Sequence, residues 1–264
     1  MSFGSGTSNH ELGAQHGATF EDLDRQALEQ YLERRASHLL AMHPLELVAT
    51  KLGLAQKTGS GVVPTGAGLL LFGHLPQLTQ PHWGVTAVKV RGCTISDPIV
   101  ARADLEGPVA TLVEQALEFV REQSRSLANQ VSPQETAVEY PEAAVREAIV
   151  NAVLHRDLRL PGRVAVRLFD DRLEIWSPGG PLGPLAPLEE LFQSGGISLP
   201  RNVHLASAAR VLGIGEQLGR GLPTIRRAVA EAIQQDVEIH SSNSDVLVVL
   251  PSGLPVSTNA AQLT

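Results

Sequence analysis

The sequence is poor in cysteine, in aromatic residues and in positive charge, and each shortage excludes a class of protein. Cys93 is the one cysteine among 264 residues, so no intrachain disulfide can form, which fits a reducing compartment. Aromatic residues make up 4%, so Leu, Val, Ala and Ile must build most of the core. The formal net charge is −7, whereas nucleic-acid binders generally carry a basic surplus that neutralises phosphates. Local basic patches at 201–210 and 220–227 keep DNA binding open.

Long apolar runs are also missing. None reaches the roughly 18 residues that span a bilayer. The N-terminus has no basic patch followed by an apolar stretch, which a secretory signal would require. We therefore expect a cytoplasmic protein that makes no membrane contact.

The length allows one large domain or two small ones. Residues 1–19 and 252–264 are rich in small and polar residues, and we expect both ends to be disordered. Residues 20–130 predict a small N-terminal α/β module of winged-helix-like character. Its expected elements are helices at 20–37 and 44–54, a helix or buried strand at 65–72, a strand at 85–91 and a long helix at 104–124.

Residues 131–251 predict a second domain with a different order of elements. A helix at 141–156 begins with proline, which suits a first turn. Two strands with a tight turn at Asp170–Asp171 follow, then an irregular Pro- and Gly-rich stretch, two helices and two final strands. Helices on one face of a mixed or antiparallel sheet satisfy this order, so the predicted fold class is α+β, a two-layer α/β sandwich. The expected later elements are strands at 164–169 and 172–176, helices at 203–212 and 223–232, and strands at 237–240 and 246–250.

The helix at 141–156 carries the most suggestive polar pattern. Glu147, Asn151 and His155 are spaced four residues apart and share one face. A carboxylate can take a proton from water, and an amide oxygen can coordinate Mg²⁺. A solvent-exposed polar stripe is the alternative interpretation of the same spacing.

Two glycine-rich segments are further candidates. Ser177-Pro178-Gly179-Gly180 follows a strand, where glycines let the backbone approach a ligand, although an ordinary turn has the same composition. The segment "GIGEQLGRGL" at 213–222 runs into a helix, whose N-terminal amides attract phosphate. It is neither a Walker loop nor a dinucleotide fingerprint, because no Gly-Lys-Ser/Thr follows and no strand precedes it.

Taken in order, several segments resemble a known family. They are "PTGAGLLLFGHLPQ", the Gly107–Pro108 helix start, "YPEAAVREAIVNAVLHRDL", "VAVRLFDDRLEIWSPGG", "ISLPRNVHLASAARVLG" and "GEQLGRGLPTIRRAV". Over roughly residues 20–251 the chain resembles RecG-related or Schlafen-like transcriptional regulators. The C-terminal part of these proteins is a divergent ATPase domain of the gyrase/histidine-kinase/MutL type, also called GHKL or Bergerat.

The resemblance implies an ATP site with Mg²⁺ beneath a lid. Glu147 matches the glutamate that activates water, and Asn151 matches the asparagine that binds Mg²⁺, with His155 on the same face. Ser177 stands where the superfamily places an adenine-binding aspartate, next to Gly179 and Gly180. The stretch 182–202 matches the lid, with Arg201 and Asn202 near its end. Gly219, Arg220 and Gly221 match the loop that wraps the phosphates.

Three hypotheses on function follow. The first is a nucleotide-binding regulatory protein with slow or no hydrolysis, a transcriptional regulator that forms a homodimer through its N-terminal helices. The second is a DNA- or protein-binding module with a vestigial ATP site. The third is a weak ATPase with Glu147 as base and Arg201 or Arg220 near the γ-phosphate. A complete helicase or histidine kinase is not expected, because no motor motif is present and the family's flanking nucleic-acid-binding modules do not fit in this chain.

Overall fold

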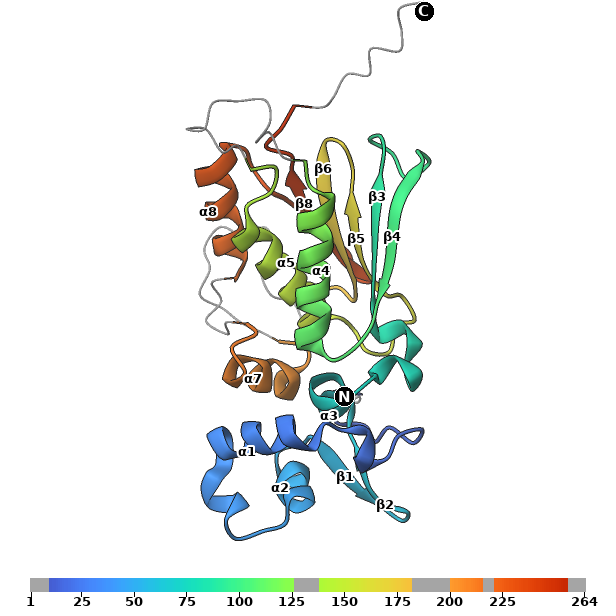
Figure 1. Ribbon diagram of the computed structural model, residues 1–264, viewed down its shortest axis with the longest axis vertical. Helices are drawn as coiled ribbons and strands as arrows, with labels where there is room; N and C mark the ends of the chain where they lie inside the picture. The colour runs from blue at the N-terminus through green and yellow to red at the C-terminus, as the bar shows by residue number, and fades with distance from the viewer. Residues whose placement is uncertain (1–9, 126–137, 182–199, 216–220, 256–264) are drawn as a thin grey trace, which may run out of the picture.

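The computed structural model describes residues 10–125, 138–181, 200–215 and 221–255. A large sheet carries helices on one face, and a smaller unit packs at one end of it (Figure 1). The fold is therefore α+β, a two-layer α/β sandwich, as the order of elements predicts.

The large sheet has six strands in the order β4-β3-β5-β6-β8-β7. Only β3 and β5 pair in parallel among these, and the other four pairings are antiparallel, so the sheet is mixed. The sheet takes strands from both sides of residue 130, the boundary expected between the two predicted domains. The bounds are β3 (Val85–Val90), β4 (Ile99–Leu105), β5 (Val164–Leu168), β6 (Arg172–Pro178), β7 (Glu238–Ser241) and β8 (Asp245–Pro251).

Three helices cover one face of this sheet: α4 (Val109–Gln123), α5 (Glu142–His155) and α8 (Gly221–Ile233) (Figure 1). Helix α5 lies between the other two and contacts both. Its larger apolar side chains are buried, including Ile149 at 0% exposure. Each such side chain contributes about 1.5–3 kcal/mol through burial. The central position of α5 fixes the direction in which its polar face points.

The smaller unit consists of three helices and a two-stranded hairpin. The stretch at 65–72, which the sequence left open between helix and strand, is a helix. Thr65 caps it, because the Thr65 hydroxyl accepts a hydrogen bond from the Gly68 amide at 3.1 Å. Helix α7 (Val203–Val211) packs on this helix and so joins the small unit to the large one. The elements of the small unit are α1 (Arg25–Leu40), α2 (Leu45–Lys51), β1 (Ala55–Thr58), β2 (Gly61–Pro64) and α3 (Gly66–Phe72).

The expected start of the long helix at 104–124 is wrong. Residues 99–105 form strand β4, and the helix begins only at Val109. Gly107 adopts a φ of +123°, which a helix does not accept, and Pro108 precedes the first helical residue. The apolar residues Ala101, Ala103 and Leu105 alternate with charged ones, which is the pattern of a strand and not of a helix.

The expectation of disorder at the N-terminus is also wrong for residues 10–19. Glu11 is fully buried, and its carboxylate accepts hydrogen bonds from the amides of His204 and Leu205 at 3.0 and 2.8 Å. These amides belong to the first turn of α7, whose N–H groups lack helical partners. A residue near the start of the chain therefore caps a helix about 190 residues away, which composition alone cannot reveal.

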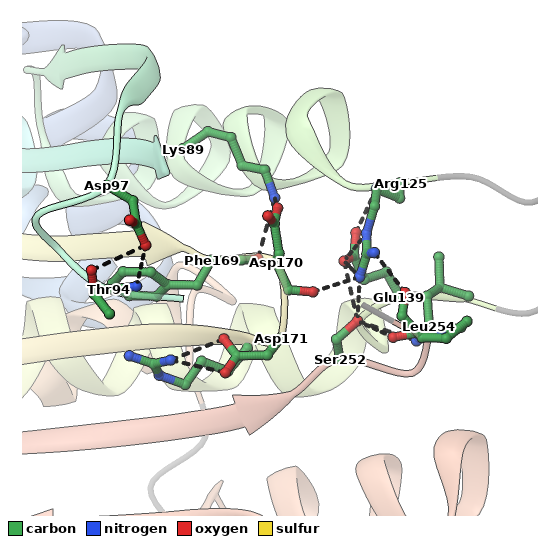
Figure 2. Close-up of polar contacts among 12 residues, drawn as sticks. Lys89, Thr94, Asp97, Arg125, Glu139, Phe169, Asp170, Asp171, Ser252 and Leu254 are labelled. Atoms are coloured by element: carbon green, nitrogen blue, oxygen red, sulfur yellow. Dashed lines mark hydrogen bonds and ion pairs between the residues drawn. The ribbon is translucent and has the colours of Figure 1, made fainter. Parts of the chain in front are cut away.

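Residues 252–255, expected in the disordered tail, are likewise part of the fold. Arg125 donates to the Glu139 carboxylate at 2.8 Å and to the hydroxyl of Ser252 at 2.9 Å (Figure 2). The same guanidinium donates to the carbonyls of Asp170 and Pro255. Glu139 has 0% side-chain exposure, so this charged network replaces the water that both ions lose. It holds the end of α4, the turn after β5 and the chain after β8 together.

Candidate functional site

The polar face of α5 begins with a hydrogen-bonded pair. The amide nitrogen of Asn151 donates to Glu147 Oε1 at 3.0 Å, one helical turn away. Both side chains are half-buried. The bond uses the amide nitrogen and not the amide oxygen, which is the atom that can coordinate a cation. A carboxylate and an amide therefore lie side by side on the helix, as the four-residue spacing predicts.

The N-terminus of α8 lies directly against this pair. A Cβ added at Gly221 would collide with Glu147 Oε1 and would lie 3.0 Å from Asn151 Nδ2. A larger residue at this position would force the ends of these two side chains to move. The first N–H groups of a helix have no intrahelical partner and carry partial positive charge. The structure thus brings Glu147, Asn151 and Gly221 together.

His155 lies at the far end of the same face of α5. Burial and, to a smaller extent, the nearby positive charge of Arg201 together lower the pKa of its imidazole to about 4. The ring is therefore neutral at pH 7. A neutral imidazole keeps one nitrogen as a hydrogen-bond acceptor, and it adds no positive charge next to Arg201.

Sequence reasoning missed Asp157, which organises this end of the site. Its carboxylate accepts hydrogen bonds from Arg159 and, at 3.1 Å, from Arg201. The hydrogen bond from the Arg159 side chain is the main cause that lowers the pKa of Asp157 to about 2, with smaller contributions from the Arg159 amide and the Arg201 charge. Asp157 lies beyond the end of α5, so helical periodicity could not point to it. The charge pattern of "HRDLR" was the available signal.

Arg201 joins this carboxylate to the glycine-rich loop. Its guanidinium also donates to the carbonyl of Gly180 at 2.6 Å. Burial lowers the pKa of Arg201, while the charge of Asp157 opposes that shift. Arg201 is thus held between two fixed acceptors, close to His155.

Asn202 and Ser177 both bind backbone carbonyls of the last turn of α5. Asn202 Nδ2 donates to the carbonyls of Leu154 and Arg156, each at 2.9 Å. Ser177 Oγ donates to the carbonyl of Ala152 at 2.8 Å, and the residue is 6% exposed. These carbonyls are among those that a helix leaves without N–H partners. Both side chains therefore complete the C-terminal end of α5.

The two glycines after Ser177 are explained by close packing. Gly179 has a φ of +103°, and a Cβ there would lie 2.7 Å from the Cβ of Asp157. A Cβ at Gly180 would collide with the carbonyl of Ser242 in the turn between β7 and β8. Glycine is thus required here by the protein's own backbone, which is the ordinary-turn alternative that the sequence left open.

The predicted residues form two groups along one face of α5. Glu147, Asn151 and Gly221 form the first, and His155, Arg201 and the Gly180 carbonyl lie in the second. Ser177 and Asn202 support the second group from behind through the carbonyls of α5. Gly219, Arg220 and the predicted lid at 182–199 lie outside the described residues.

The first group fits the phosphate end of a Mg²⁺-bound nucleotide. It offers a carboxylate, an amide oxygen and a helix N-terminus, and Gly221 packs directly against the first two. Hard oxygen ligands suit Mg²⁺, and helix N-termini suit phosphate. At the other end of the site, the Ser177 hydroxyl is buried and donates to Ala152, so we assign it no contact with a base.

Comparisons with known proteins agree with this fold. Residues 162–250 match a family described as "Putative ATP-dependent DNA helicase recG C-terminal". The match includes β5, β6, α7, α8, β7 and β8 but begins after α5. The expected resemblance to the RecG-related, ATPase-like family is confirmed by this match. No curated protein matches the chain.

One solved structure illustrates the breadth of the likeness. The DIP2311 protein from Corynebacterium diphtheriae is 21% identical, with a TM-score of 0.62. The likeness covers 94% of this chain and 48% of that one, so this chain spans about half the length of the protein it resembles. Within the described ranges, no helix is both long and apolar enough to cross a membrane.

Proposed function

We propose that the chain binds ATP with Mg²⁺ and acts as a nucleotide-responsive regulatory protein with slow or no hydrolysis. The match of residues 162–250 to the RecG-related, ATPase-like family supports this proposal. The observation that carries the proposal is the contact of Gly221, at the N-terminus of α8, with the Glu147–Asn151 pair. Three groups suited to a cation and a phosphate converge there from two elements that lie far apart in the sequence.

Each residue has a distinct role in this proposal. The amide oxygen of Asn151 holds the cation, and the first amides of α8 bind the phosphates, joined by Gly219 and Arg220 of the preceding loop. Mg²⁺ supplies neutralisation of the phosphate charge when it is bound. Glu147 orients Asn151 through the hydrogen bond between them, and its carboxylate is the group that would accept a proton from water.

The regulatory part of the proposal rests on the second group. Arg201 and Asn202 tie the start of α7 to the end of α5 and to the glycine-rich loop. The same first turn of α7 is capped by Glu11. A ligand that pulled Arg201 away from Asp157 would therefore act on α7 and on residues 10–15. Low hydrolysis follows if Arg201 stays paired with Asp157, because it then adds no positive charge at the γ-phosphate.

The test is calorimetric titration with ATP and with a non-hydrolysable analogue, with and without Mg²⁺. We expect Mg²⁺-dependent binding that weakens by about tenfold or more in Asn151→Ala, which corresponds to about 1.4 kcal/mol. Asn243→Ala, an exposed asparagine in the turn before β8, is the matched control and should bind as the wild type does. Binding that Asn151→Ala leaves unchanged would contradict the assignment of this site.

A specific observation favours the second candidate, a DNA- or protein-binding module with a vestigial site. Glu147 and Asn151 bond to each other, Gly221 packs on both, and Ser177 bonds to α5, so the protein's own groups already satisfy one another. Titration without heat, together with an unchanged melting temperature at millimolar nucleotide, would support this alternative. Binding to DNA that weakens with salt would then assign the partner.

A further inference from the structure

Strand β4 forms one outer edge of the six-stranded sheet. In the part of the chain that the structure describes, β4 pairs with β3 on one side and with no strand on the other. It lies at the right-hand margin in Figure 1, away from the smaller unit's hairpin. A strand at a sheet edge exposes a row of unpaired N–H and C=O groups that can pair with another strand. A partner strand could therefore form backbone hydrogen bonds with this edge.

The two edges of the sheet differ in how well they resist such pairing. Strand β7, at the opposite edge, has four residues, of which Glu238, His240 and Ser241 are exposed. Strand β4 has seven residues without proline or lysine, the two residue types that commonly protect edges. Its first two residues, Ile99 and Val100, are 52% and 46% exposed. The longer and less protected edge is thus β4.

The residues of β4 divide cleanly between the two faces of the sheet. Ala101, Ala103 and Leu105 are half-buried and pack toward the core, whereas Arg102 and Asp104 are exposed on the face without helices. The Thr86 hydroxyl donates to Asp104 at 2.8 Å, and Arg102 donates to Asp104 at 3.0 Å. One positive and one negative side chain therefore stand two residues apart on the same face.

The charges of Arg102 and Asp104 can pair with those of a second copy of β4 in one antiparallel register. Directly opposite residues in an antiparallel pair point to the same face, so two copies of β4 must pair with one residue at the two-fold axis. An axis at Arg102 places arginine opposite arginine, and an axis at Asp104 places aspartate opposite aspartate. An axis at Ala101 places Arg102 opposite Val100.

With the axis at Ala103, every charged position of the strand meets its opposite. Arg102 lies opposite Asp104 of the second copy, and Asp104 lies opposite Arg102 of the second copy. On the helix-facing side, Ala101 lies opposite Leu105 of the second copy, so half-buried apolar side chains cover one another. Opposite-charge and apolar pairs that face each other across two strands stabilise a sheet, and like charges that face each other destabilise it.

We propose that a second copy of this chain pairs with β4 in this antiparallel register and extends the sheet across a two-fold axis at Ala103. The partner is thus the protein itself. The interface lies on β4 and not on the N-terminal helices, which the sequence favoured. The proposal does not depend on nucleotide binding, so either can fail without the other.

Charge reversal at these two positions tests the register. Sedimentation over a concentration series should give a dimer for the wild type and a monomer for both Arg102→Asp and Asp104→Arg, because each places like charges opposite each other twice. An equimolar mixture of the two variants should form a dimer again, since the introduced aspartate of one copy then faces the introduced arginine of the other. The double variant with both reversals should also dimerise.

Glu33→Arg, on the exposed side of α1, is the matched control. It should remain a dimer and so separate β4 from the N-terminal helices. A wild type that is monomeric throughout the series would overturn the proposal, as would dimers that persist in both single reversals or a dimer lost only in Glu33→Arg. Recovery in the mixture also shows that the single variants are folded.

Discussion

Replacing Asp157 with asparagine should destabilise the protein in a way that depends on pH. The carboxylate is 6% exposed and holds Arg201 and Arg159. Its pKa is about 2 in the folded protein, against 3.8 for an ordinary aspartate. One pKa unit corresponds to about 1.4 kcal/mol, so the charge contributes about 2 kcal/mol at neutral pH. Loss of the charge also leaves Arg201 without its anionic partner, so we expect a total of about 2–3 kcal/mol.

The sign of the pH dependence follows from the lowered pKa. The unfolded chain binds the proton more readily than the folded one, so the stabilisation is fully present above pH 3.8 and is lost as the pH falls through about 2. By pH 3 it should have fallen to roughly half of its value at neutral pH. An asparagine side chain does not titrate, so the difference between wild type and Asp157→Asn should shrink in step.

Urea unfolding between pH 7 and pH 3 provides the measurement. Fluorescence of the two tryptophans, Trp83 and Trp176, and far-ultraviolet circular dichroism should give the same midpoint for a two-state transition. Asp236→Asn, at an exposed aspartate, is the control and should change stability by less than about 0.5 kcal/mol. A difference between wild type and Asp157→Asn that stays constant over this pH range would refute the argument.

Three further predictions test the packing and the site. Gly68→Ala should destabilise the protein by about 1–3 kcal/mol, because the added Cβ would collide with the backbone carbonyl of Leu54. Gly59→Ala is the control, because the space around Gly59 is open. Equal melting temperatures of the two variants in thermal unfolding would contradict this packing. Glu11→Ala should lower the free energy of unfolding by about 1–3 kcal/mol, because it removes the cap of α7. Hydrogen exchange at the His204 and Leu205 amides should become faster. Unchanged exchange would show that the cap is unimportant. The ring of His155 should titrate near pH 4 in an NMR experiment. The stability of the protein should fall as the pH drops from about 6.5 toward 4, because the unfolded chain takes up the proton first. A titration midpoint near 6.5 would show that the ring is not buried.

The main architecture could be predicted from the order of elements because the signals were local. Helix α5 and strands β5, β6, β7 and β8 lie where the apolar periodicity places them. The four-residue spacing of Glu147 and Asn151 was enough to place them side by side, since helical geometry depends on neighbours alone. Strand β4 was the failure, because a long helical pattern from 104 onward concealed the stop at Gly107.

Only some contacts of the candidate site could be predicted from local sequence patterns. That Gly221 meets Glu147 depends on how α8 packs against α5, about 70 residues earlier in the chain. The role of Asp157 depends on Arg201, which is brought back by α7. Neither relation leaves a periodic trace in the sequence, because each arises between elements and not within one.

Local patterns in the sequence were therefore enough for most elements of the second half of the chain, the two-layer α+β class and the polar face of α5, because spacing and turn residues act over a few neighbours. Only the tertiary structure decided which of those residues meet, that residues 10–19 and 252–255 are held in the fold, and that the sheet ends at a bare seven-residue strand. Those outcomes follow from packing and buried hydrogen bonds between distant segments, whose free energy depends on the whole arrangement.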